Sequence, residues 1–424
     1  MDSFVIDGPV RLEGTVAVGG AKNAVLPAMT AALLTEGTSR LERVPHLRDT
    51  ATMAHLLRVL GARVEHAGGT LRIDTSTYDY CEAPYELVKT MRASIYCLGP
   101  LLAKKGRAKV SLPGGCAWGP RPVDLHLMGM EKLGARISLS HGYVIAEAPH
   151  GLRGTEIFFE ISSVGATINV MMAAVLAQGK TTLVNAAREP EVAEIAETLN
   201  QAGARIEGAG GYRIEIQGVR ELRPLEHAVM ADRIEAGTFL IAGMMTGGDV
   251  RVEHCRPDHL HALLEKMQQM GAEIEVGDTW VRVHGSSTLQ PVDVTTAPYP
   301  GFPTDLQAQI MAALARANGV SLVTETIYPD RFTHVPELRR LGAKIRLDGN
   351  IAVVTGGQGL SGAPVMATDL RASAALILSA FAAEGRTVIS RVYHMDRGYE
   401  RIEEKFAALG AAIERGRERD PAEV

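Results

Sequence analysis

Residues 341–354, LGAKIRLDGNIAVV, contain the pattern that decides the fold. The pair Gly342-Ala343 ends an amphipathic helix, and the residues after it predict a strand with a hairpin partner at 350–354. The same pair, followed two residues later by a β-branched residue, recurs six times. It stands at Gly61-Ala62, Gly134-Ala135, Gly203-Ala204, Gly271-Ala272, Gly342-Ala343 and Gly410-Ala411. Spacings of 73, 69, 68, 71 and 68 residues indicate one supersecondary unit used six times, because chance pairs would not keep a period.

Each unit has the same predicted anatomy. An apolar helix ends at a glycine suited to a C-cap, a strand follows, and an amphipathic helix then leads into a strand hairpin. In the third unit these are the strand 181–184 and the helix 191–201. The helix-ending glycines are Gly37, Gly106, Gly179, Gly247, Gly319 and Gly385. The unit is therefore βαβαββ, and because three units make a domain of ordinary size, six predict two domains.

Composition excludes several classes of function. The chain has 424 residues, 46% hydrophobic and 22% charged, and a net charge of −5, which argues against non-specific nucleic-acid binding. Four separated cysteines without a CxxC pair indicate neither a disulfide framework nor a zinc site, and suit a reducing compartment. The start lacks a signal-peptide pattern, and the most apolar run, 168–176, is too short to span a membrane, so a cytoplasmic protein is expected.

Polar or charged residues stand at five of the six predicted starts of the apolar helices. The positions fourteen residues before the helix-ending glycines are Asn23, Arg92, Gly165, Arg233, Asp305 and Arg371. An arginine also lies 11 to 15 residues before every glycine–alanine pair, at Arg48, Arg121, Arg188, Arg256, Arg331 and Arg397. A cation at a helix N-terminus costs roughly 0.3–1 kcal/mol, so several of them suggest a bound anion. About half are expected to pair with acids instead, notably Arg371 with Asp369 or Asp232.

A glycine-rich loop at 112–126, LPGGCAWGPRPVDLH, carries a thiol. A lone cysteine such as Cys116 is more often a small buried hydrophobe than a reactive group. Here two glycines precede it and Arg121 follows, an arrangement that can lower a thiol pKa and present the thiol to an anionic substrate. The loop therefore favours a reactive Cys116.

This loop, together with GGAKNA at 19–24 and DRGYER at 396–401, resembles the UDP-N-acetylglucosamine 1-carboxyvinyltransferase family, and the resemblance covers nearly the whole chain. It implies the enolpyruvyl transferase fold, an α/β architecture of two inside-out barrels built from six βαβαββ repeats with the helices inside. It further implies one domain at 22–230, carrying the Cys116 loop, and a second formed by 1–21 plus 231–424. The active site is then expected in the cleft between them.

The resemblance also implies a reaction and its residues. The enolpyruvyl group of phosphoenolpyruvate moves to the 3′-hydroxyl of UDP-N-acetylglucosamine and phosphate leaves, with no metal or other cofactor and no nucleic-acid or membrane partner. Cys116 matches the general acid, which can also hold phosphoenolpyruvate covalently, and Asp305 matches the general base. The local sequence alone fits Asp305 equally well as a helix N-cap.

The remaining roles follow from the same resemblance. Lys22, Arg121 and Arg397 match the cations on phosphoenolpyruvate, with Arg331 at its carboxylate. Asp369 and Arg371 match residues needed for turnover. The matches to sugar-nucleotide contacts are Asn23, Arg92, Arg121, Pro122, Val123, Asp124, Leu125, Ser163, Val164, Gly165 and Ile327.

Three other functions fit the sequence less well. A sister enzyme acting on shikimate 3-phosphate would not be expected to carry Gly-Gly-Cys before Arg-Pro-Val-Asp. A non-catalytic paralogue should have lost one of Lys22, Cys116, Asp305 or Arg397, and a repeat scaffold has no use for cations at helix starts. The one departure noted is Trp118, where the family often has a smaller aliphatic residue.

Overall fold

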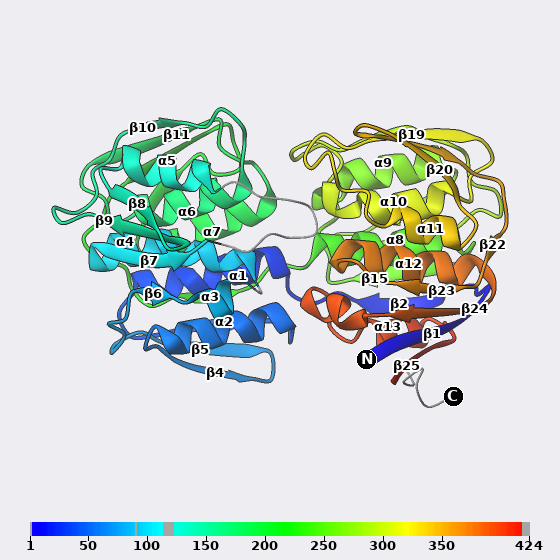
Figure 1. The fold of residues 1–424 in the computed structure, drawn as a ribbon, viewed down its shortest axis with the longest axis horizontal. Helices are drawn as coiled ribbons and strands as arrows, with labels where there is room; N and C mark the ends of the chain where they lie inside the picture. The colour runs from blue at the N-terminus through cyan, green and yellow to red at the C-terminus, as the bar shows by residue number, and fades with distance from the viewer. Residues whose placement is uncertain (1, 90, 113–122, 418–424) are drawn as a thin grey trace. The chain divides into compact units, whose positions relative to one another are not determined.

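The computed structural model describes residues 2–89, 91–112 and 123–417. The chain forms two compact units (Figure 1). Gly20–Met230 make the inserted unit, and Met1–Gly19 with Ala231–Val424 make the terminal unit, which contains both ends of the chain. Among the described residues, the inserted unit has three sheets of four strands, and the terminal unit has two sheets of four strands and one of five.

All six sheets share one strand order. Counted as the strands lie side by side, the first and second are parallel, whereas the second and third, and the third and fourth, are antiparallel. The sheets of the inserted unit are β14 (Glu226–Ala228), β3 (Thr38–Glu42), β5 (Thr70–Asp74), β4 (Arg63–Ala67); β6 (Glu82–Ala83), β7 (Arg107–Ser111), β9 (Tyr143–Glu147), β8 (Arg136–Ser140); and β10 (Glu156–Phe158), β11 (Lys180–Val184), β13 (Arg213–Gln217), β12 (Arg205–Glu207). The predicted βαβαββ unit is confirmed.

The terminal unit repeats this order with strands from both ends of its chain. Its sheets are β2 (Glu13–Ala17), β15 (Asp249–Glu253), β17 (Trp280–His284), β16 (Glu273–Val276); β18 (Val294–Thr295), β19 (Val320–Thr324), β21 (Ile351–Thr355), β20 (Lys344–Asp348); and β22 (Leu360–Ser361) with β23 (Pro364–Met366), β24 (Ala383–Ser390), β1 (Asp2–Gly8), β25 (Ile413–Arg417). The strands β1 and β2 therefore pair with partners more than two hundred residues away, as in Val16 beside Val252.

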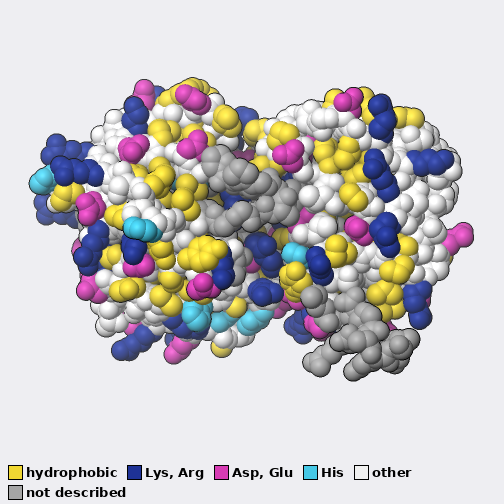
Figure 2. Space-filling model, viewed as in Figure 1, with side chains coloured by type: hydrophobic (Ala, Val, Ile, Leu, Met, Phe, Trp, Pro, Cys, Tyr) yellow, Lys and Arg dark blue, Asp and Glu magenta, His cyan; other side chains and the backbone are white. Residues whose placement is uncertain are grey.

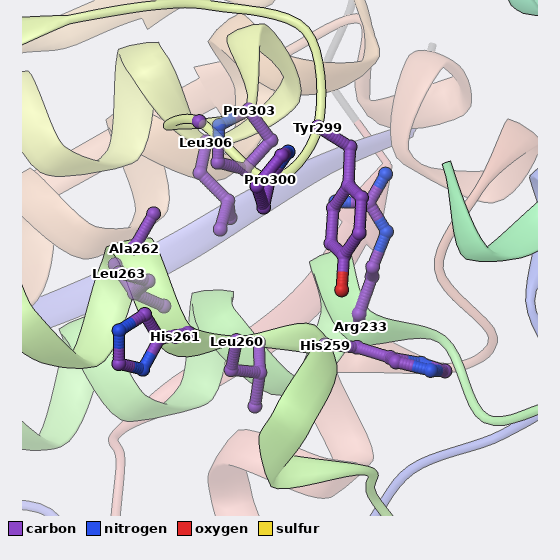
Figure 3. Close-up of a pocket in the computed structure, with 11 residues that line it drawn as sticks. Arg233, His259, Leu260, His261, Ala262, Leu263, Tyr299, Pro300, Pro303 and Leu306 are labelled. Atoms are coloured by element: carbon purple, nitrogen blue, oxygen red, sulfur yellow. The ribbon is translucent and has the colours of Figure 1, made fainter. Parts of the chain in front are cut away.

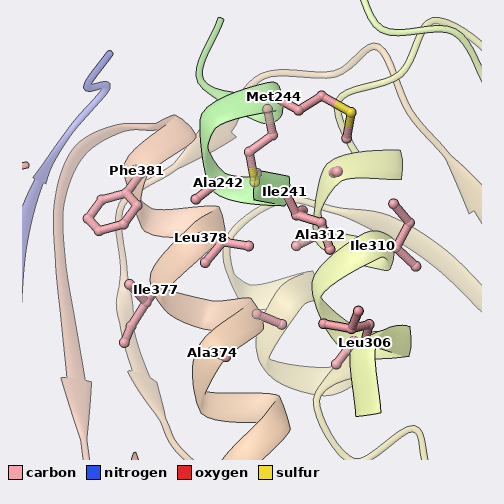
Figure 4. Close-up of a cluster of buried hydrophobic side chains, with 14 of the residues drawn as sticks. Ile241, Ala242, Met244, Leu306, Ile310, Ala312, Ala374, Ile377, Leu378 and Phe381 are labelled. Carbon is pink, nitrogen blue, oxygen red and sulfur yellow. The ribbon is translucent and has the colours of Figure 1, made fainter. Parts of the chain in front are cut away.

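Three helices lie at the centre of each unit and contact one another. They are α1 (Lys22–Ala31), α4 (Leu98–Lys105) and α6 (Val164–Ala174) in the inserted unit, and α8 (Arg233–Met245), α10 (Gln307–Leu314) and α12 (Leu370–Ala382) in the terminal unit. Every residue of α8 is buried, and Figure 4 shows Met244, Ile310 and Phe381 from three different helices in one apolar cluster. A helix that is apolar on all sides must be covered on all sides, which accounts for the sheets around it.

The second helix of each unit is amphipathic. These helices are α2 (Arg48–Val59), α5 (Asp124–Lys132), α7 (Pro190–Gln201), α9 (His261–Gln269), α11 (Val335–Arg340) and α13 (Ile402–Ala408). Short helical turns complete the set: α3 (Tyr85–Val88), η1 (Ala32–Leu34), η2 (Arg92–Cys97), η3 (Pro257–His259), η4 (Thr304–Leu306) and η5 (Val392–Arg397). In α7, for example, Val192, Ile195 and Leu199 are buried while Glu197 and Asn200 face outward.

The glycine–alanine pairs end these amphipathic helices in one conformation. All six glycines have φ between 92° and 110°. In the third unit, Gly203 N donates to Asn200 O (3.0 Å) and Ala204 N donates to Leu199 O (2.9 Å), the two hydrogen bonds of a Schellman motif. The same two bonds occur at the other five pairs. The pair recurs because only glycine adopts this backbone without strain.

The six glycines that were predicted to be C-caps of the central helices lie only partly at those positions. Of the six predicted C-caps, Gly106 is confirmed, as the C-cap of α4. Gly247 directly follows the C-cap of α8. The predictions for Gly37, Gly179 and Gly319 are wrong, because η1, α6 and α10 have their C-caps at Thr35, Val175 and Ala315, two to four residues earlier. Gly385, in contrast, lies inside β24, where the predicted C-cap is wrong because α12 ends earlier, at Ala382. All six glycines of this series have positive φ, so they turn the chain from a central helix into its strand.

The described part of the chain contains no helix of the length and apolar character that crossing a membrane requires. On the visible face of each unit, Lys and Arg are interspersed with Asp, Glu and hydrophobic side chains (Figure 2). This mixture accords with the net charge of −5.

Replacing Gly203 by Ala tests the repeat. At φ +110°, with no atom within 4 Å of an added Cβ, the substitution should cost only left-handed strain, about 1–2 kcal/mol, and lower the melting temperature by a few degrees. Gly359→Ala is the matched control, because its Cβ also meets open space but its φ lies outside the left-handed range. Equal melting temperatures for the two variants in scanning calorimetry would contradict the assignment.

Candidate functional site

Asp305 is the centre of a cluster of buried charges in the terminal unit. Its Oδ1 lies 2.8 Å from Nη2 of Arg331, and its Oδ2 lies 3.0 Å from Nη2 of Arg371. The two arginine side chains are only 8% and 5% exposed, whereas the Asp305 side chain is 24% exposed. One carboxylate therefore joins two guanidinium groups and still reaches solvent.

Three helix starts bring these residues together. Asp305 lies inside the turn η4, directly before α10, and Pro303 takes the cap position of that turn. The interpretation of Asp305 as an N-cap is therefore wrong, since Asp305 lies inside the turn and its carboxylate binds Arg331 and Arg371. Arg371 is the second residue of α12, and Arg331 precedes α11.

The electrostatics of the cluster are dominated by the arginines. Burial alone would raise the pKa of Asp305, but the charges of Arg371 and Arg331 outweigh it and hold the pKa well below its usual range. Burial lowers the pKa of Arg371, and the charge of Asp305 more than compensates, so its pKa is raised above the usual value. Both groups are thus ionised at neutral pH.

Asp369 fixes the position of Arg371 by binding the backbone at the start of α12. Its Oδ1 accepts hydrogen bonds from Arg371 N (2.8 Å) and Ala372 N (3.0 Å), which makes it the N-cap of α12. Its Oδ2 accepts from Thr333 Oγ1 (3.1 Å). The guanidinium of Arg371 pairs with Asp305 and not with the expected Asp369, whose carboxylate caps the helix start. The charge of Asp232, the other expected partner, also helps to raise the pKa of Arg371.

Lys22 begins the first central helix of the inserted unit. Its Nζ lies 2.7 Å from Oδ2 of Asp49, a buried residue in the first turn of α2. The sequence analysis did not select Asp49, although its place directly after Arg48 at a predicted helix start was a usable signal. The pair shows that a helix-start cation in this unit has an internal counter-charge.

Of the residues expected to contact the sugar nucleotide, Arg92 and Gly165 lie near His126 of α5. Burial, with a smaller contribution from the charge of Arg92, lowers the pKa of His126 to about 4, so the ring is neutral at pH 7. Nδ2 of Asn169 lies 2.9 Å from Nδ1 of His126, which places the ring proton on Nε2. A Cβ on Gly165 would lie 3.1 Å from that Nε2, so α5 and the start of α6 approach closely because residue 165 is glycine.

The start of α6 is a ready anion site by its construction. Ser163 Oγ accepts from Ala166 N (3.3 Å), which caps the helix, and Val164 and Gly165 form its first turn. Free N–H groups at a helix N-terminus favour phosphate. Asn23 is exposed beside Lys22, and the half-buried Val123 and Leu125 flank the exposed Asp124 at the start of α5.

The other expected residues are placed as follows. Ile327 follows β19, and its backbone N donates to Oε1 of Glu325 (2.8 Å). Arg397 is half-buried and ends η5. Cys116, Trp118, Arg121 and Pro122 lie outside the described residues, so their roles stay predictions.

A separate small pocket, with a cavity volume of about 20 Å³, borders the Asp305 turn (Figure 3). Pro303 and Leu306, on either side of Asp305, form part of its wall. Across it the Arg233 guanidinium lies 5.8 Å from the centre of the Tyr299 ring. The pocket is mostly apolar and contains none of the site residues expected from the sequence. Within the described ranges, no group of three or more His, Cys, Asp and Glu is arranged to hold a metal ion.

Comparison with known proteins gives a consistent picture. The family profile described as EPSP synthase (3-phosphoshikimate 1-carboxyvinyltransferase) matches residues 6–406. A UDP-N-acetylglucosamine 1-carboxyvinyltransferase of Solibacter usitatus is 55% identical over 98% of this chain and 100% of its own length. A protein of the same name from an Anaeromyxobacter species is 57% identical over 98% and 99%.

Solved structures agree on the fold. The enolpyruvyl transferase NikO of Streptomyces tendae superposes with a TM-score of 0.89 at 28% identity and covers 98% of both chains. EPSP synthase of Acinetobacter baumannii has the same fold, with a TM-score of 0.76 at 19% identity over 98% of this chain and 100% of its own. The six-repeat α/β architecture is therefore the enolpyruvyl transferase fold, as predicted.

Asp305→Asn tests the buried cluster by stability. Loss of the carboxylate charge leaves two buried guanidinium groups without their counter-ion, so unfolding free energy at pH 7 should fall by about 3–5 kcal/mol. Because the folded pKa is depressed, this advantage of Asp305 is complete above pH ~4, near the unfolded value, and is lost as pH falls through the lower folded pKa.

The control for this experiment is Asp258→Asn. Asp258 binds Arg256 at 3.0 Å in an exposed pair, and its loss should cost less than about 1 kcal/mol. Thermal melting of the variants and the parent between pH 7 and pH 3 makes the comparison. Similar shifts for both substitutions at pH 7 would mean that the Asp305 cluster does not carry buried charge.

Proposed function

Because the chain belongs to the UDP-N-acetylglucosamine 1-carboxyvinyltransferase family, we propose that it transfers the enolpyruvyl group of phosphoenolpyruvate to the 3′-hydroxyl of UDP-N-acetylglucosamine and releases phosphate. Full-length identity of 55–57% to relatives of that name carries the proposal. The partly accessible Asp305 carboxylate supplies the base that the chemistry needs. This reaction is the first committed step of peptidoglycan synthesis, and its nucleotide substrate places the enzyme in the cytoplasm.

The reaction is an addition followed by an elimination. A proton adds to C3 of phosphoenolpyruvate while the sugar 3′-oxygen bonds to C2 and gives up its own proton to a base. A proton then leaves the new methyl group, the C2–O bond to phosphate breaks, and the double bond returns. Each step needs a positioned acid or base, and cations that stabilise the phosphate and carboxylate.

We assign these roles to residues from both units. Asp305 accepts the proton of the sugar hydroxyl, and Cys116 is the acid at C3 and the site of a covalent phosphoenolpyruvate adduct. Lys22, Arg121 and Arg397 hold the phosphate and carboxylate, with Arg331 at the carboxylate. Asp369 supports turnover through Arg371, whose backbone it fixes at the start of α12.

The low pKa of Asp305 in the unbound protein fits this role once the substrate is considered. A carboxylate held by two guanidinium groups is a weak base. An anionic substrate at Arg331 partly neutralises that guanidinium, and with less positive charge beside it the pKa of Asp305 rises. Substrate binding therefore increases the proton affinity of Asp305 at the stage when it must accept a proton.

The nucleotide end belongs to the inserted unit in this proposal. The diphosphate lies at the start of α6, where Ser163, Val164 and Gly165 offer backbone N–H groups. Arg92 neutralises further charge, and the neutral His126 supports the packing of the α5 and α6 starts. The remaining contacts are those given by the family resemblance: Asn23, Arg121, Pro122, Val123, Asp124, Leu125 and Ile327.

Phosphate release tests the reaction directly. With phosphoenolpyruvate as donor, release should require UDP-N-acetylglucosamine, and shikimate 3-phosphate should not replace it. Fosfomycin, an epoxide that alkylates the loop cysteine of this family, should stop release by modifying Cys116, which mass spectrometry would locate. Release with shikimate 3-phosphate would favour the sister activity, and nucleotide binding without any release would favour a non-catalytic paralogue.

Lys22→Met tests the cation from the inserted unit. Because the variant lacks the cation that binds phosphoenolpyruvate, kcat/KM for that substrate should fall by about a hundredfold, with little change in UDP-N-acetylglucosamine binding. Since Lys22→Met also removes the cation 2.7 Å from the buried Asp49 carboxylate, the double variant with Asp49→Asn separates folding from catalysis. Lys105→Met, in the looser pair with Asp79 at 3.7 Å, is the control and should keep full activity. Equal kinetics of the two lysine variants would remove Lys22 from the site.

A further inference from the structure

Glu325, the residue after β19, holds two segments of the site together. Its side chain is fully buried. Its Oε1 accepts hydrogen bonds from Thr296 Oγ1 (2.8 Å), Ile327 N (2.8 Å) and Tyr328 N (3.0 Å). Its Oε2 accepts from Thr304 Oγ1 (2.8 Å), in the turn that carries Asp305. One carboxylate therefore connects the Asp305 turn with the segment that leads to Arg331.

The direction of each hydrogen bond in this network is fixed by chemistry. A carboxylate can only accept and a guanidinium can only donate. The Thr304 hydroxyl thus gives its one proton to Glu325, which leaves its lone pairs to accept from Nη1 of Arg331 at 2.9 Å. The same guanidinium binds Asp305 through Nη2 at 2.8 Å. The bonds form a relay that runs from Asp305 through Arg331 and Thr304 to Glu325.

The relay depends on the charge of Glu325. In Glu325→Gln, the amide oxygen must stay where three donors converge, so the NH₂ group faces Thr304. The Thr304 hydroxyl then accepts from the amide, and its own proton turns toward Arg331, which also presents protons. Arg331 loses an acceptor and its hold on Asp305 weakens, although the shape of the side chain is unchanged.

We propose that Glu325 is a positioning residue for the general base, acting through Thr304 and Arg331 on Asp305. It touches neither substrate in this scheme. The inference rests on the proposed function, because it assigns to Glu325 the task of orienting the Asp305 carboxylate for the sugar hydroxyl.

Kinetics of Glu325→Gln as a function of pH provide the first test. We expect kcat to fall about tenfold, the value of one hydrogen bond to a charged group, with KM for UDP-N-acetylglucosamine within about twofold because Ile327 keeps its contact. A weaker Arg331 contact also raises the pKa of Asp305, so the acid limb of the kcat profile should move to higher pH. A merely structural role would lower the amount of active enzyme without moving that limb.

Three threonine variants separate the relay from the scaffold. Thr304→Val should reproduce the lower kcat and the shifted acid limb, and Thr304→Ser, which keeps the hydroxyl, should restore both. Thr296→Val removes a hydroxyl from the same carboxylate on the side away from Arg331 and should leave the acid limb in place. If Glu325→Gln does not fold, the pair Thr304→Val and Thr304→Ser tests the relay alone.

A crystal structure of Glu325→Gln distinguishes failure of this inference from failure of the proposed function, since it needs no turnover. Arg331 should have moved beyond hydrogen-bonding distance of Thr304. An unmoved Arg331, an unshifted acid limb, or equal shifts for Thr296→Val and Thr304→Val would overturn the role of Glu325 even in an active enzyme. An inactive parent protein would instead count against the reaction.

Discussion

Six helices that are apolar on every face are the constraint on which the rest of the structure depends. Such a helix has no side that can face water, so three of them pack together in each unit and three sheets with their amphipathic helices surround them. Polar groups inside these helices need internal partners. Asn169 in α6 donates to Ile95 O and bonds to His126, and Glu235 in α8 pairs with Lys405. The charged residues of the Asp305 cluster lie at helix starts.

Placing charge at those starts creates a second problem, which the protein solves internally. A cation at a helix N-terminus opposes the macrodipole. Lys22 is balanced by Asp49 and Arg371 by Asp305, so at these two positions the cost is offset without any ligand. Repeated cations at helix starts therefore do not by themselves indicate a bound anion, because internal carboxylates can balance them. The carboxylates that neutralise the cations are themselves part of the site.

The parts of the structure that could be predicted from sequence are those encoded locally. The six glycine–alanine pairs specify a backbone that few residues other than glycine adopt, and this local rule was enough to give the period, the unit and the fold. The C-cap at Gly385 was predicted wrongly, because the end of α12 is set by where the sheet begins and not by the glycine. The fold was therefore predictable from turns more than from helices.

The site residues named from the sequence came from the family resemblance, and their roles stay predictions. Asp49 pairs with Lys22, 27 positions away, and His126 packs against Gly165, 39 positions away. Glu325 accepts a hydrogen bond from Thr304, 21 positions away. No short pattern records such a contact, since it exists only after the units have folded. Buried acids that satisfy several donors at once were the class of residue that sequence reasoning missed.

The balance of charge around Asp305 decides how the site can work. Asp305, Glu325 and Asp369 are three carboxylates against the two guanidinium groups of Arg331 and Arg371, so this group of five has no excess of positive charge. Its charge does not favour a phosphate, so in the proposed reaction the attraction comes from cations outside this group. Once an anion is present, Arg331 is shared between the anion and Asp305. Negative charge then exceeds positive charge locally, and the group that can relieve the imbalance by accepting a proton is the partly exposed Asp305. In the proposed reaction, a carboxylate that is a weak base in the unbound protein would become a stronger one when the anionic substrate binds.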